Sequence, residues 1–325
     1  MGIQAAPEVK FSLIREAVQR DHNLLTICLM CEIAGVSRSG YYEWCHAQSA
    51  REAREAEDQK DFALILEAYR YRGYAKGVRS IHMRLLHMNE IMNVKKIRRL
   101  MRKYNLRCPI RGANPYRRMA KALATNNVAG NVVNREFRQG VRKVLLTDIT
   151  YLFYHGGKCY LSTILDAYTH EVLAYSVSES LKVDFVIKTV ELLIAEHGST
   201  LDNETIVHSD QGCHYTSQAF IQKLKDAAFV QSMSRRGNCW DNAPQESFFG
   251  HMKDEIAGLI SRCQDFEQVK AQIDDWMDYY NNDRGQWDLK KLTPREYCQY
   301  ALTGIYPLPV YSKPSSRGAA PDPEV

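Results

Sequence analysis

Three acidic residues lie where a divalent-metal site would need them. Asp148 lies within an apolar run, Asp210 directly follows another, and Glu246 falls in the first turn of a helix expected after Pro244. A carboxylate inside an apolar strand is costly unless something compensates its charge. Mg²⁺ does so, because it binds a few carboxylate oxygens together with waters and substrate phosphates. Two such ions can assist an in-line displacement at phosphorus, so these residues predict phosphoryl transfer.

Each of these carboxylates, taken alone, also fits a structural role. Asp148 can be a hydrogen-bonded residue near a strand end, and Glu246 can complement the dipole of its helix. Structural carboxylates are more numerous than metal ligands, so a single residue would not favour a catalytic site. Whether the three form a catalytic site therefore depends on the strands and helices that would bring them together.

Short apolar runs separated by turn signals predict a sheet from residue 144 onward. The first three runs follow one another directly, which favours antiparallel strands, and helices alternate with the later two. This order, βββαβαβα, indicates a mixed α/β sheet flanked by helices. The expected strands are Val144–Leu152, Tyr160–Leu165, Val172–Val177, Thr205–Ser209 and Val230–Ser234, and the expected helices are Val183–Glu196, Ser217–Ala228, one after Pro244 that continues past Glu255, and Phe266–Tyr280.

The first hundred residues predict helices only. Leu24–Ala34 has a helical apolar pattern, Gly35-Val36-Ser37 forms a turn, and Ser37 can cap a following helix. This order is typical of a helix-turn-helix. Further helices are expected over Asp61–Tyr69, Val78–Leu86 and, after an N-cap at Asn93, Val94–Tyr104. Residues 105–140 predict a basic, irregular linker.

Charge is distributed unevenly along the chain. Residues 1–143 hold 27 Lys or Arg and 13 Asp or Glu, whereas residues 144–325 hold 16 and 25. Residues 91–121 carry eleven basic residues and no carboxylate, which favours a DNA phosphate contact over a merely solvated face. On the helix after Asn93, Ile97, Leu100 and Met101 form an apolar stripe. The candidate DNA-binding residues on its other faces are Lys95, Lys96, Arg98, Arg99, Arg102 and Lys103.

Several other polar residues have a structural interpretation that competes with a functional one. Cys28-x-x-Cys31 suggests zinc, but core packing is favoured because no second ligand pair has finger-like spacing. His208 and His214 flank Asp210 and either orient it, contact DNA or simply pack. Two further aspartates, Asp166 and Asp241, are expected in turns. The aromatic residues Trp276, Tyr279 and Tyr280 are expected in the core.

The composition also indicates in which cellular compartment the protein acts. No run approaches about 18 apolar residues, and the N-terminus has no apolar signal core, so neither a membrane span nor secretion is expected. Nine scattered cysteines indicate reduced thiols and a cytoplasmic protein. The last nineteen residues hold five prolines and are expected to be disordered.

Blocks of sequence around the carboxylates resemble one family. Asp210 and Glu246 are separated by 35 residues, which is the DD(35)E spacing of the retroviral-integrase superfamily. The flanking blocks resemble bacterial insertion-sequence transposases, most closely the downstream-frame (OrfB) product of the IS-three family. These blocks are His208-Ser209-Asp210-Gln211-Gly212, Ser234-Arg235-Arg236-Gly237-Asn238, Glu246-Ser247-Phe248-Phe249, Leu165-Asp166-Ala167-Tyr168-Thr169 and, near the N-terminus, Gly35-Val36-Ser37-Arg38-Ser39-Gly40. In one departure, Lys76 stands where the family usually has Tyr.

The resemblance implies an RNase-H-like catalytic core in which Asp148, Asp210 and Glu246 are both the catalytic triad and the ligands of two Mg²⁺ or Mn²⁺ ions. It implies cleavage of insertion-sequence ends by water, followed by transfer of the 3′-hydroxyl to another strand. Lys253, about two helical turns after Glu246, would hold the terminal DNA phosphates. The implied partners are double-stranded DNA at the terminal repeats and the target, further copies of the chain, and the upstream-frame (OrfA) product.

The domain organisation follows from these elements. Residues 1–50 are expected to form the helix-turn-helix-like region, and residues 51–121 the basic DNA-binding domain. A linker at 122–143, the catalytic core at 144–260, a helical extension at 261–306 and the tail at 307–325 complete the chain. The alternative function is that of a domesticated sequence-specific DNA-binding protein without transposition activity. A stand-alone nuclease is disfavoured by the separate basic helical region.

Overall fold

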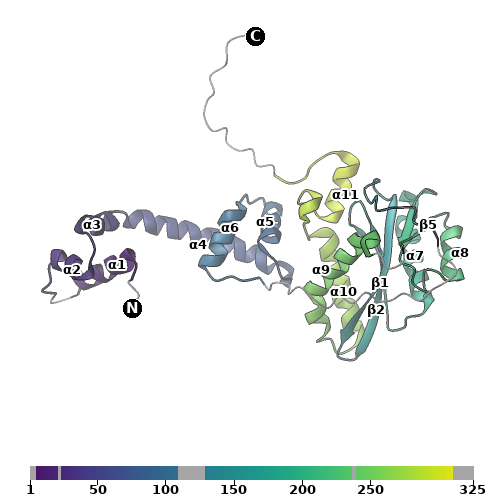
Figure 1. Cartoon of the computed structure of the whole chain (residues 1–325), viewed down its shortest axis with the longest axis horizontal. Coiled ribbons are helices and arrows are strands. Elements are labelled where there is room, and N and C mark those ends of the chain that lie inside the picture. Colours follow the sequence, from purple (N-terminus) through teal and green to yellow (C-terminus); the bar gives the residue numbers. More distant parts are fainter. Residues whose placement is uncertain (1–4, 21–22, 109–128, 236–238, 310–325) are drawn as a thin grey trace, which may run out of the picture. The chain divides into compact units, whose positions relative to one another are not determined.

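The computed structural model describes residues 5–20, 23–108, 129–235 and 239–309. The chain divides into two compact units, Met1–Leu64 and Ile65–Val325 (Figure 1). Most of the tail, which is expected to be disordered, and much of the expected basic linker lie outside the described residues.

The first unit is built from three short helices and the start of a long one. Helices α1 (Pro7–Val18), α2 (Ile27–Ala34) and α3 (Arg38–His46) enclose a small core, and α4 (Gln48–Arg70) follows. The side chain of Thr26 caps α2, so this helix starts three residues later than expected, and Ser37 caps α3 as expected. α4 continues through the expected boundary at residue 50, and it is much longer than the helix expected over Asp61–Tyr69.

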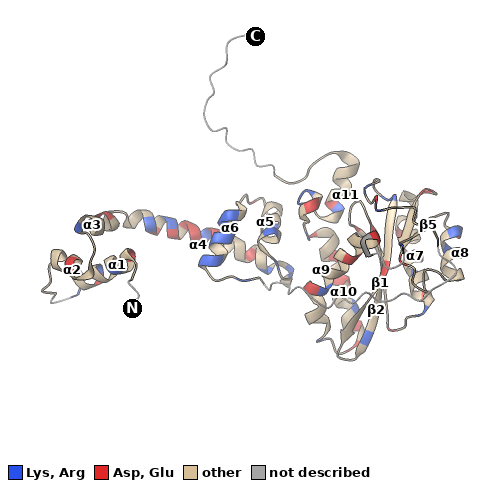
Figure 2. Ribbon diagram, viewed as in Figure 1, with Lys and Arg blue, Asp and Glu red and all other residues tan. Residues whose placement is uncertain are grey.

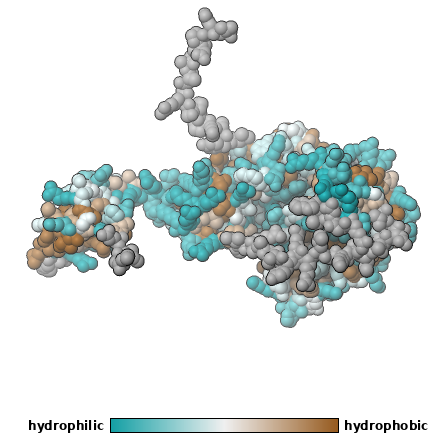
Figure 3. All heavy atoms as spheres, viewed as in Figure 1, coloured by the Kyte–Doolittle hydropathy of each residue, from teal (hydrophilic) through white to brown (hydrophobic). Residues whose placement is uncertain are grey.

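The surface of this unit is partly apolar around α2. Leu24, Leu29 and Ile33 are exposed hydrophobic residues, and Figure 3 shows hydrophobic residues gathered there. Core packing is confirmed for Cys31, which is buried, but it is wrong for Cys28, which is exposed because it lies in the first turn of α2, beyond the core.

Within the second unit, a turn between α4 and α5 (Val78–His87) is attached to helix α10 (Phe266–Asn282). Arg72 pairs with three carboxylates on and just after α10, at 2.9 Å from Asp275, 3.1 Å from Asp283 and also with Asp278. Tyr71 donates a hydrogen bond to Asp283 at 2.8 Å. Exposed ion pairs are individually weak, but a guanidinium shared by several carboxylates forms a network.

Lys76, which stands where the family usually has Tyr, stabilises this turn through hydrogen bonds to its backbone. Its side chain is only 2% exposed, and its ammonium group donates to the backbone carbonyls of Tyr69, Tyr71 and Tyr74. Burial lowers the pKa of Lys76 to about 8. These donated bonds satisfy carbonyl groups that would otherwise be left without partners between two helices.

The sheet of the second unit has the order β3-β2-β1-β4-β5. Its strands are β1 (Val144–Tyr154), β2 (Gly157–Asp166), β3 (Val172–Ser178), β4 (Ile206–Ser209) and β5 (Val230–Met233). The first three pair antiparallel, whereas β4 is parallel to both β1 and β5. The mixed sheet expected from the sequence is therefore confirmed, and each strand lies within two or three residues of its expected bounds.

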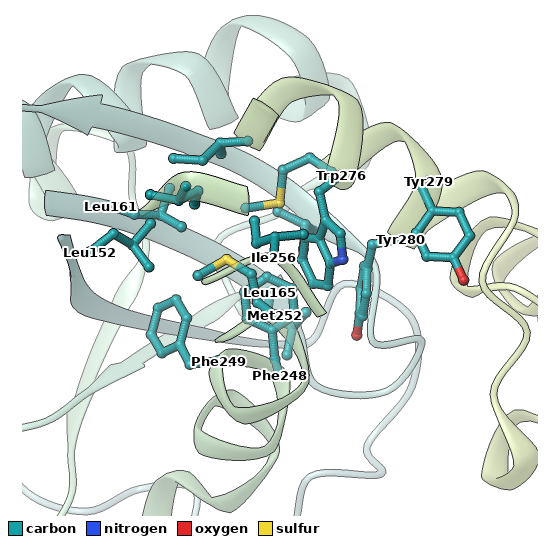
Figure 4. Close-up of a cluster of buried hydrophobic side chains, with 14 of the residues drawn as sticks. Leu152, Leu161, Leu165, Phe248, Phe249, Met252, Ile256, Trp276, Tyr279 and Tyr280 are labelled. Atoms are coloured by element: carbon teal, nitrogen blue, oxygen red, sulfur yellow. The ribbon is translucent and has the colours of Figure 1, made fainter. Parts of the chain in front are cut away.

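Helices cover both faces of this sheet (Figure 1). α7 (Val183–His197) and α8 (Gln218–Asp226) pack against one face, and α9 (Ala243–Ile260) with α10 packs against the other. Even-numbered residues of β1, such as Leu146 and Leu152, face α9 and α10. Figure 4 shows that cluster, in which Trp276, Tyr279 and Tyr280 are buried as expected.

The basic helix α6 (Val94–Lys103) also belongs to the second unit and follows α5. The last helix of that unit, α11 (Pro294–Thr303), connects to α5 through His87. His87 Nε2 lies 2.8 Å from Glu296 Oε2, and its Nδ1 lies 2.8 Å from the carbonyl of Met83. Burial opposes protonation of His87, but Glu296 outweighs it, so the pKa of His87 is raised and that of Glu296 is lowered.

This pair predicts a pH-dependent contribution to stability. Because the folded state raises the pKa of His87, the contribution is complete below about pH 6.5, the ordinary His value, and is lost as pH rises through the folded value. His87→Gln should lower the free energy of unfolding by about 1–2 kcal/mol at pH 6 and by less at pH 9. Chemical denaturation at both pH values measures this, with exposed His155→Gln as the control. An equal loss at both pH values would contradict a charged pair.

Candidate active site and DNA-binding helix

The sheet register brings the first two acidic residues together. β1 pairs with β4 as far as Leu146 opposite His208. Asp148 and Asp210 each lie two residues further along these neighbouring strands, so they come next to each other at the point where the parallel pairing ends. Side chains alternate along a strand, so Asp148 shares the face of Leu146, which is covered by α9.

The third acidic residue reaches this point through a specific anchor. Glu246 lies in the first turn of α9, and the preceding Gln245 is fully buried. Gln245 Nε2 donates a hydrogen bond to Thr163 Oγ1, and Thr163 is the residue of β2 paired directly with Asp148. The start of α9 is therefore attached beside Asp148. Sequence reasoning did not identify Gln245 as a positioning residue, because a buried amide has no distinctive spacing.

Burial and neighbouring charge shift the pKa values of these carboxylates. Burial, followed by the negative charges of Asp210 and Glu246, raises the pKa of Asp148 to about 8, although Lys253 opposes the shift. Desolvation also raises the pKa of Asp210, against a hydrogen bond of 2.8 Å from the Gly212 N–H and the nearby His214. Carboxylates that repel one another are the donor set that a divalent cation stabilises.

The donor chemistry fits a hard divalent cation, since it consists of carboxylate oxygens. Among the residues that the structure describes, however, no three His, Cys, Asp or Glu side chains are gathered closely enough to hold a metal ion. The three carboxylates are thus adjacent in the fold without converging on a single point.

Lys253 lies beside this group. Its ammonium nitrogen is 5.0 Å from the centre of the Tyr151 ring, and its charge acts on Asp148. Burial lowers the pKa of Lys253, and Asp148 acts in the opposite direction. The side chain is half-buried rather than projecting freely from the helix.

The two histidines near Asp210 have different environments. His208 is fully buried, with Nδ1 2.9 Å from Ser232 Oγ and Nε2 3.2 Å from Ser234 Oγ, so it packs between strands. His214 donates to the carbonyl of Leu181 at 2.8 Å while its charge acts on Asp210.

The two aspartates expected in turns also differ. Asp166 accepts hydrogen bonds from the Tyr168 N–H at 3.0 Å and from Thr169 Oγ1 at 2.9 Å, so the turn is confirmed. Asp241 is instead a buried ion-pair partner, contacted at 2.8 Å by Arg135 and at 2.9 Å by Arg235. The Arg235 hydrogen bonds hold the pKa of Asp241 well below its usual range, against burial.

The basic helix presents its charges as the sequence predicted. Asn93 caps α6, and Ile97, Leu100 and Met101 are buried. Figure 2 shows Lys and Arg gathered on this helix. Lys96 is half-buried, and the exposed residues are Lys95, Arg98, Arg99, Arg102 and Lys103.

Comparisons with known proteins identify the families that this chain resembles. Residues 139–239 and 246–302 match families described as "Integrase core domain", and residues 56–114 match "HTH-like domain". A putative transposase InsK for insertion sequence element IS150 of Escherichia coli is 32% identical over 81% of this chain and 90% of its own length. Transposase InsF for insertion sequence IS3A of Escherichia coli is 26% identical over 80% and 91%. Among solved structures, the catalytic core domain of BIV integrase has a TM-score of 0.40 at 19% identity, covering 50% of this chain and 98% of that one.

The fold and the matched families thus define a DNA-binding enzyme with an integrase catalytic core, which depends on a divalent metal. The chain belongs to the IS-three family of insertion-sequence transposases, as a protein of the OrfB type. This finding favours the transposase over the alternative of a DNA-binding protein without transposition activity. Within the described residues, no helix is long and apolar enough to cross a membrane.

The repulsion among the carboxylates predicts a measurable effect on stability. In EDTA, Asp148→Asn should keep or raise the melting temperature, by about 2–4 °C for each 1 kcal/mol of relieved repulsion. Asp226→Asn, on the exposed side of α8, is the matched control. A melting temperature clearly below that of wild type would show that Asp148 stabilises the fold in its charged form.

Proposed function

We propose that the protein binds the terminal repeats of its insertion sequence and that Asp148, Asp210 and Glu246 hold two Mg²⁺ or Mn²⁺ ions for cleavage and joining. The observation that carries this proposal is the placement of Asp148 beside Asp210, with Gln245 attaching the helix that bears Glu246 to the strand pair of Asp148. The charges of Asp210 and Glu246, which act with burial to raise the pKa of Asp148, support it.

The chemistry is a pair of displacements at phosphorus. Water attacks the phosphate at the element end and releases a 3′-hydroxyl. That hydroxyl then attacks a phosphate of the target strand, forms the new phosphodiester and displaces the 3′-oxygen of the target strand, which leaves as a 3′-hydroxyl. Bound divalent ions activate the attacking oxygen and stabilise the leaving oxygen. The carboxylates hold the ions, Gln245 keeps Glu246 in place, and Lys253 binds a terminal phosphate beside them.

DNA is held by a second element of the same compact unit. The exposed Lys and Arg side chains of α6 neutralise DNA phosphates, and Lys96 at its edge contributes to this face. The Arg72 network and the His87–Glu296 pair attach the adjoining segments to α10 and α11, which supports a DNA-binding helix that acts within the same compact unit as the carboxylates.

Transposition also requires partners. The protein acts as a homo-multimer that bridges element ends and target DNA, and the OrfA product joins it on the terminal repeats. Exposed apolar residues of α2, including Ile33, support a protein contact in the first unit. Action in the bacterial cytoplasm, at the nucleoid, follows from the DNA substrate.

Neutralising the acidic residues tests the assignment of the active site. Asp148→Asn, Asp210→Asn and Glu246→Gln keep side-chain size but remove the charge that holds the metal. Each should reduce Mg²⁺-dependent joining of an element end to target DNA on the order of 10³-fold or more, because several kcal/mol of charge stabilisation is lost. DNA binding should persist in all three. A folded variant with near-wild-type joining would exclude that residue as a ligand.

Removing charge from α6 tests the DNA contact. If the face neutralises about 6–10 phosphates, wild-type affinity should fall about 10³–10⁵-fold between about 50 and about 200 mM salt. Replacing Arg98, Arg99 and Arg102 by Ala should weaken binding and lower the salt slope by about 3. The control removes the same charge elsewhere, through Ala substitutions at Lys188, Lys225 and Lys270. Equal effects of the two triple variants would reject a specific role for α6.

The proposed role of Lys253 is tested by comparing DNA affinity with the rate of end processing. Lys253→Ala should lower the rate of end processing at limiting DNA, on the order of tenfold, while overall DNA affinity changes little, because one phosphate contact near the metal site is lost. Lys225→Ala, on α8, is the matched control. Wild-type processing by the Lys253 variant would count against a substrate contact.

A further inference from the structure

The hairpin that follows Asp148 exposes two aromatic side chains on one face. Tyr151 is 56% exposed and Phe153 is 63% exposed, whereas Leu152 and Tyr154, which alternate with them, are buried. The two exposed rings contact each other, with centroids 5.5 Å apart at 73°. Contiguous exposed apolar side chains of this kind are typical of binding surfaces.

The charge around these rings favours a polyanion. Between Asp148 and Asp166 the sequence contains no Asp or Glu. Lys158 is paired with Phe153 across the hairpin, and its ammonium lies 5.7 Å from the centre of the Tyr160 ring. At the other end, Lys253 of α9 lies over the Tyr151 ring. Cations therefore stand at both ends of the aromatic face.

The exposed rings of Tyr151 and Phe153 lie close to the candidate active site. Tyr151 is three residues after Asp148 on β1, which is about 10 Å along an extended strand and, because side chains alternate, on the opposite face of the sheet. Lys253 connects the two, since it contacts the Tyr151 ring and its charge acts on Asp148. Because β4 pairs with β1 only as far as Leu146, a DNA strand whose phosphate lies at the carboxylates would reach these rings around the β1 edge that Lys253 spans.

We propose that Tyr151 and Phe153 form a stacking platform for unpaired DNA bases next to the reacting phosphate, with Lys253 and Lys158 contacting the strand's backbone. Exposed rings beside lysines are the combination by which proteins hold single strands, because every base has a face that can stack. Paired bases inside a duplex offer no such face, so the platform favours a frayed or single-stranded end. Only the placement beside the reacting phosphate rests on the proposed function.

The test compares two DNA probes with the full-length protein in EDTA. One is a fluorescein-labelled blunt duplex, and the other is the same duplex with a short single-stranded thymidine tail. By fluorescence anisotropy, wild type should bind the tailed probe about 5- to 100-fold more tightly, since stacking contributes about 1–3 kcal/mol per base. The double variant Tyr151→Leu with Phe153→Leu should lose this preference and keep its affinity for the blunt duplex.

Two matched variants separate stacking from other effects. Tyr151→Phe with Phe153→Tyr retains both rings and should keep the preference. Asp148→Asn should also keep it, so loss of joining and loss of stacking are scored independently, and failure of the proposed function would not by itself remove the preference. If the double leucine variant is misfolded by circular dichroism, the single Phe153→Leu change at the more exposed ring is used instead.

Three results would overturn the proposal. The first is equal binding of tailed and blunt probes by wild type. The second is a preserved preference in the folded leucine variant. The third is a leucine variant that changes the oligomeric state on gel filtration while its preference for the tail is unaltered, which would make this face a protein interface.

Discussion

The parallel pairing of β1 with β4 is the constraint on which the site depends. It places Asp148 beside Asp210 just beyond Leu146 and His208, at the edge where both strands leave their shared ladder. A one-residue slip would turn Asp148 to the opposite face, away from α9 and Glu246. The buried residues of β1 on both faces, packed against α9 and α10 on one side and α7 and α8 on the other, are what fix this register.

A second consequence concerns how DNA binding and catalysis are linked. The basic helix α6 is part of the same compact unit as the integrase core. The segment before α5 is attached to α10 by Arg72, and the end of α5 is attached to α11 by His87. Lys76 is buried between these two attachments, and its ammonium group donates hydrogen bonds to backbone carbonyls of this turn, including that of Tyr74. If α6 binds DNA as proposed, the same compact unit holds the DNA and carries the carboxylates.

Much of this arrangement could be predicted from the sequence, because the signals were local. Apolar runs with turn residues between them located the five strands, and Asn93, Ser37 and Pro244 marked helix starts. What could not be predicted depends on contacts between distant residues. Asp241 is a turn residue by type, but Arg135 lies 106 positions away in the chain and Arg235 only six, and both converge on it. The role of Gln245 likewise depends on Thr163, 82 positions away. The partners of Lys76 are close in the chain, but they are backbone carbonyls that only the folded turn brings to its ammonium group.

The central claim is that the three adjacent carboxylates hold the catalytic ions. Titration of Mn²⁺ into the full-length protein bound to an insertion-sequence end, followed by electron paramagnetic resonance of the free ion, tests it most directly. The account predicts two bound ions per active site in wild type and the loss of at least one in Asp148→Asn, with DNA still bound. Unchanged Mn²⁺ stoichiometry and affinity in that variant would contradict the account.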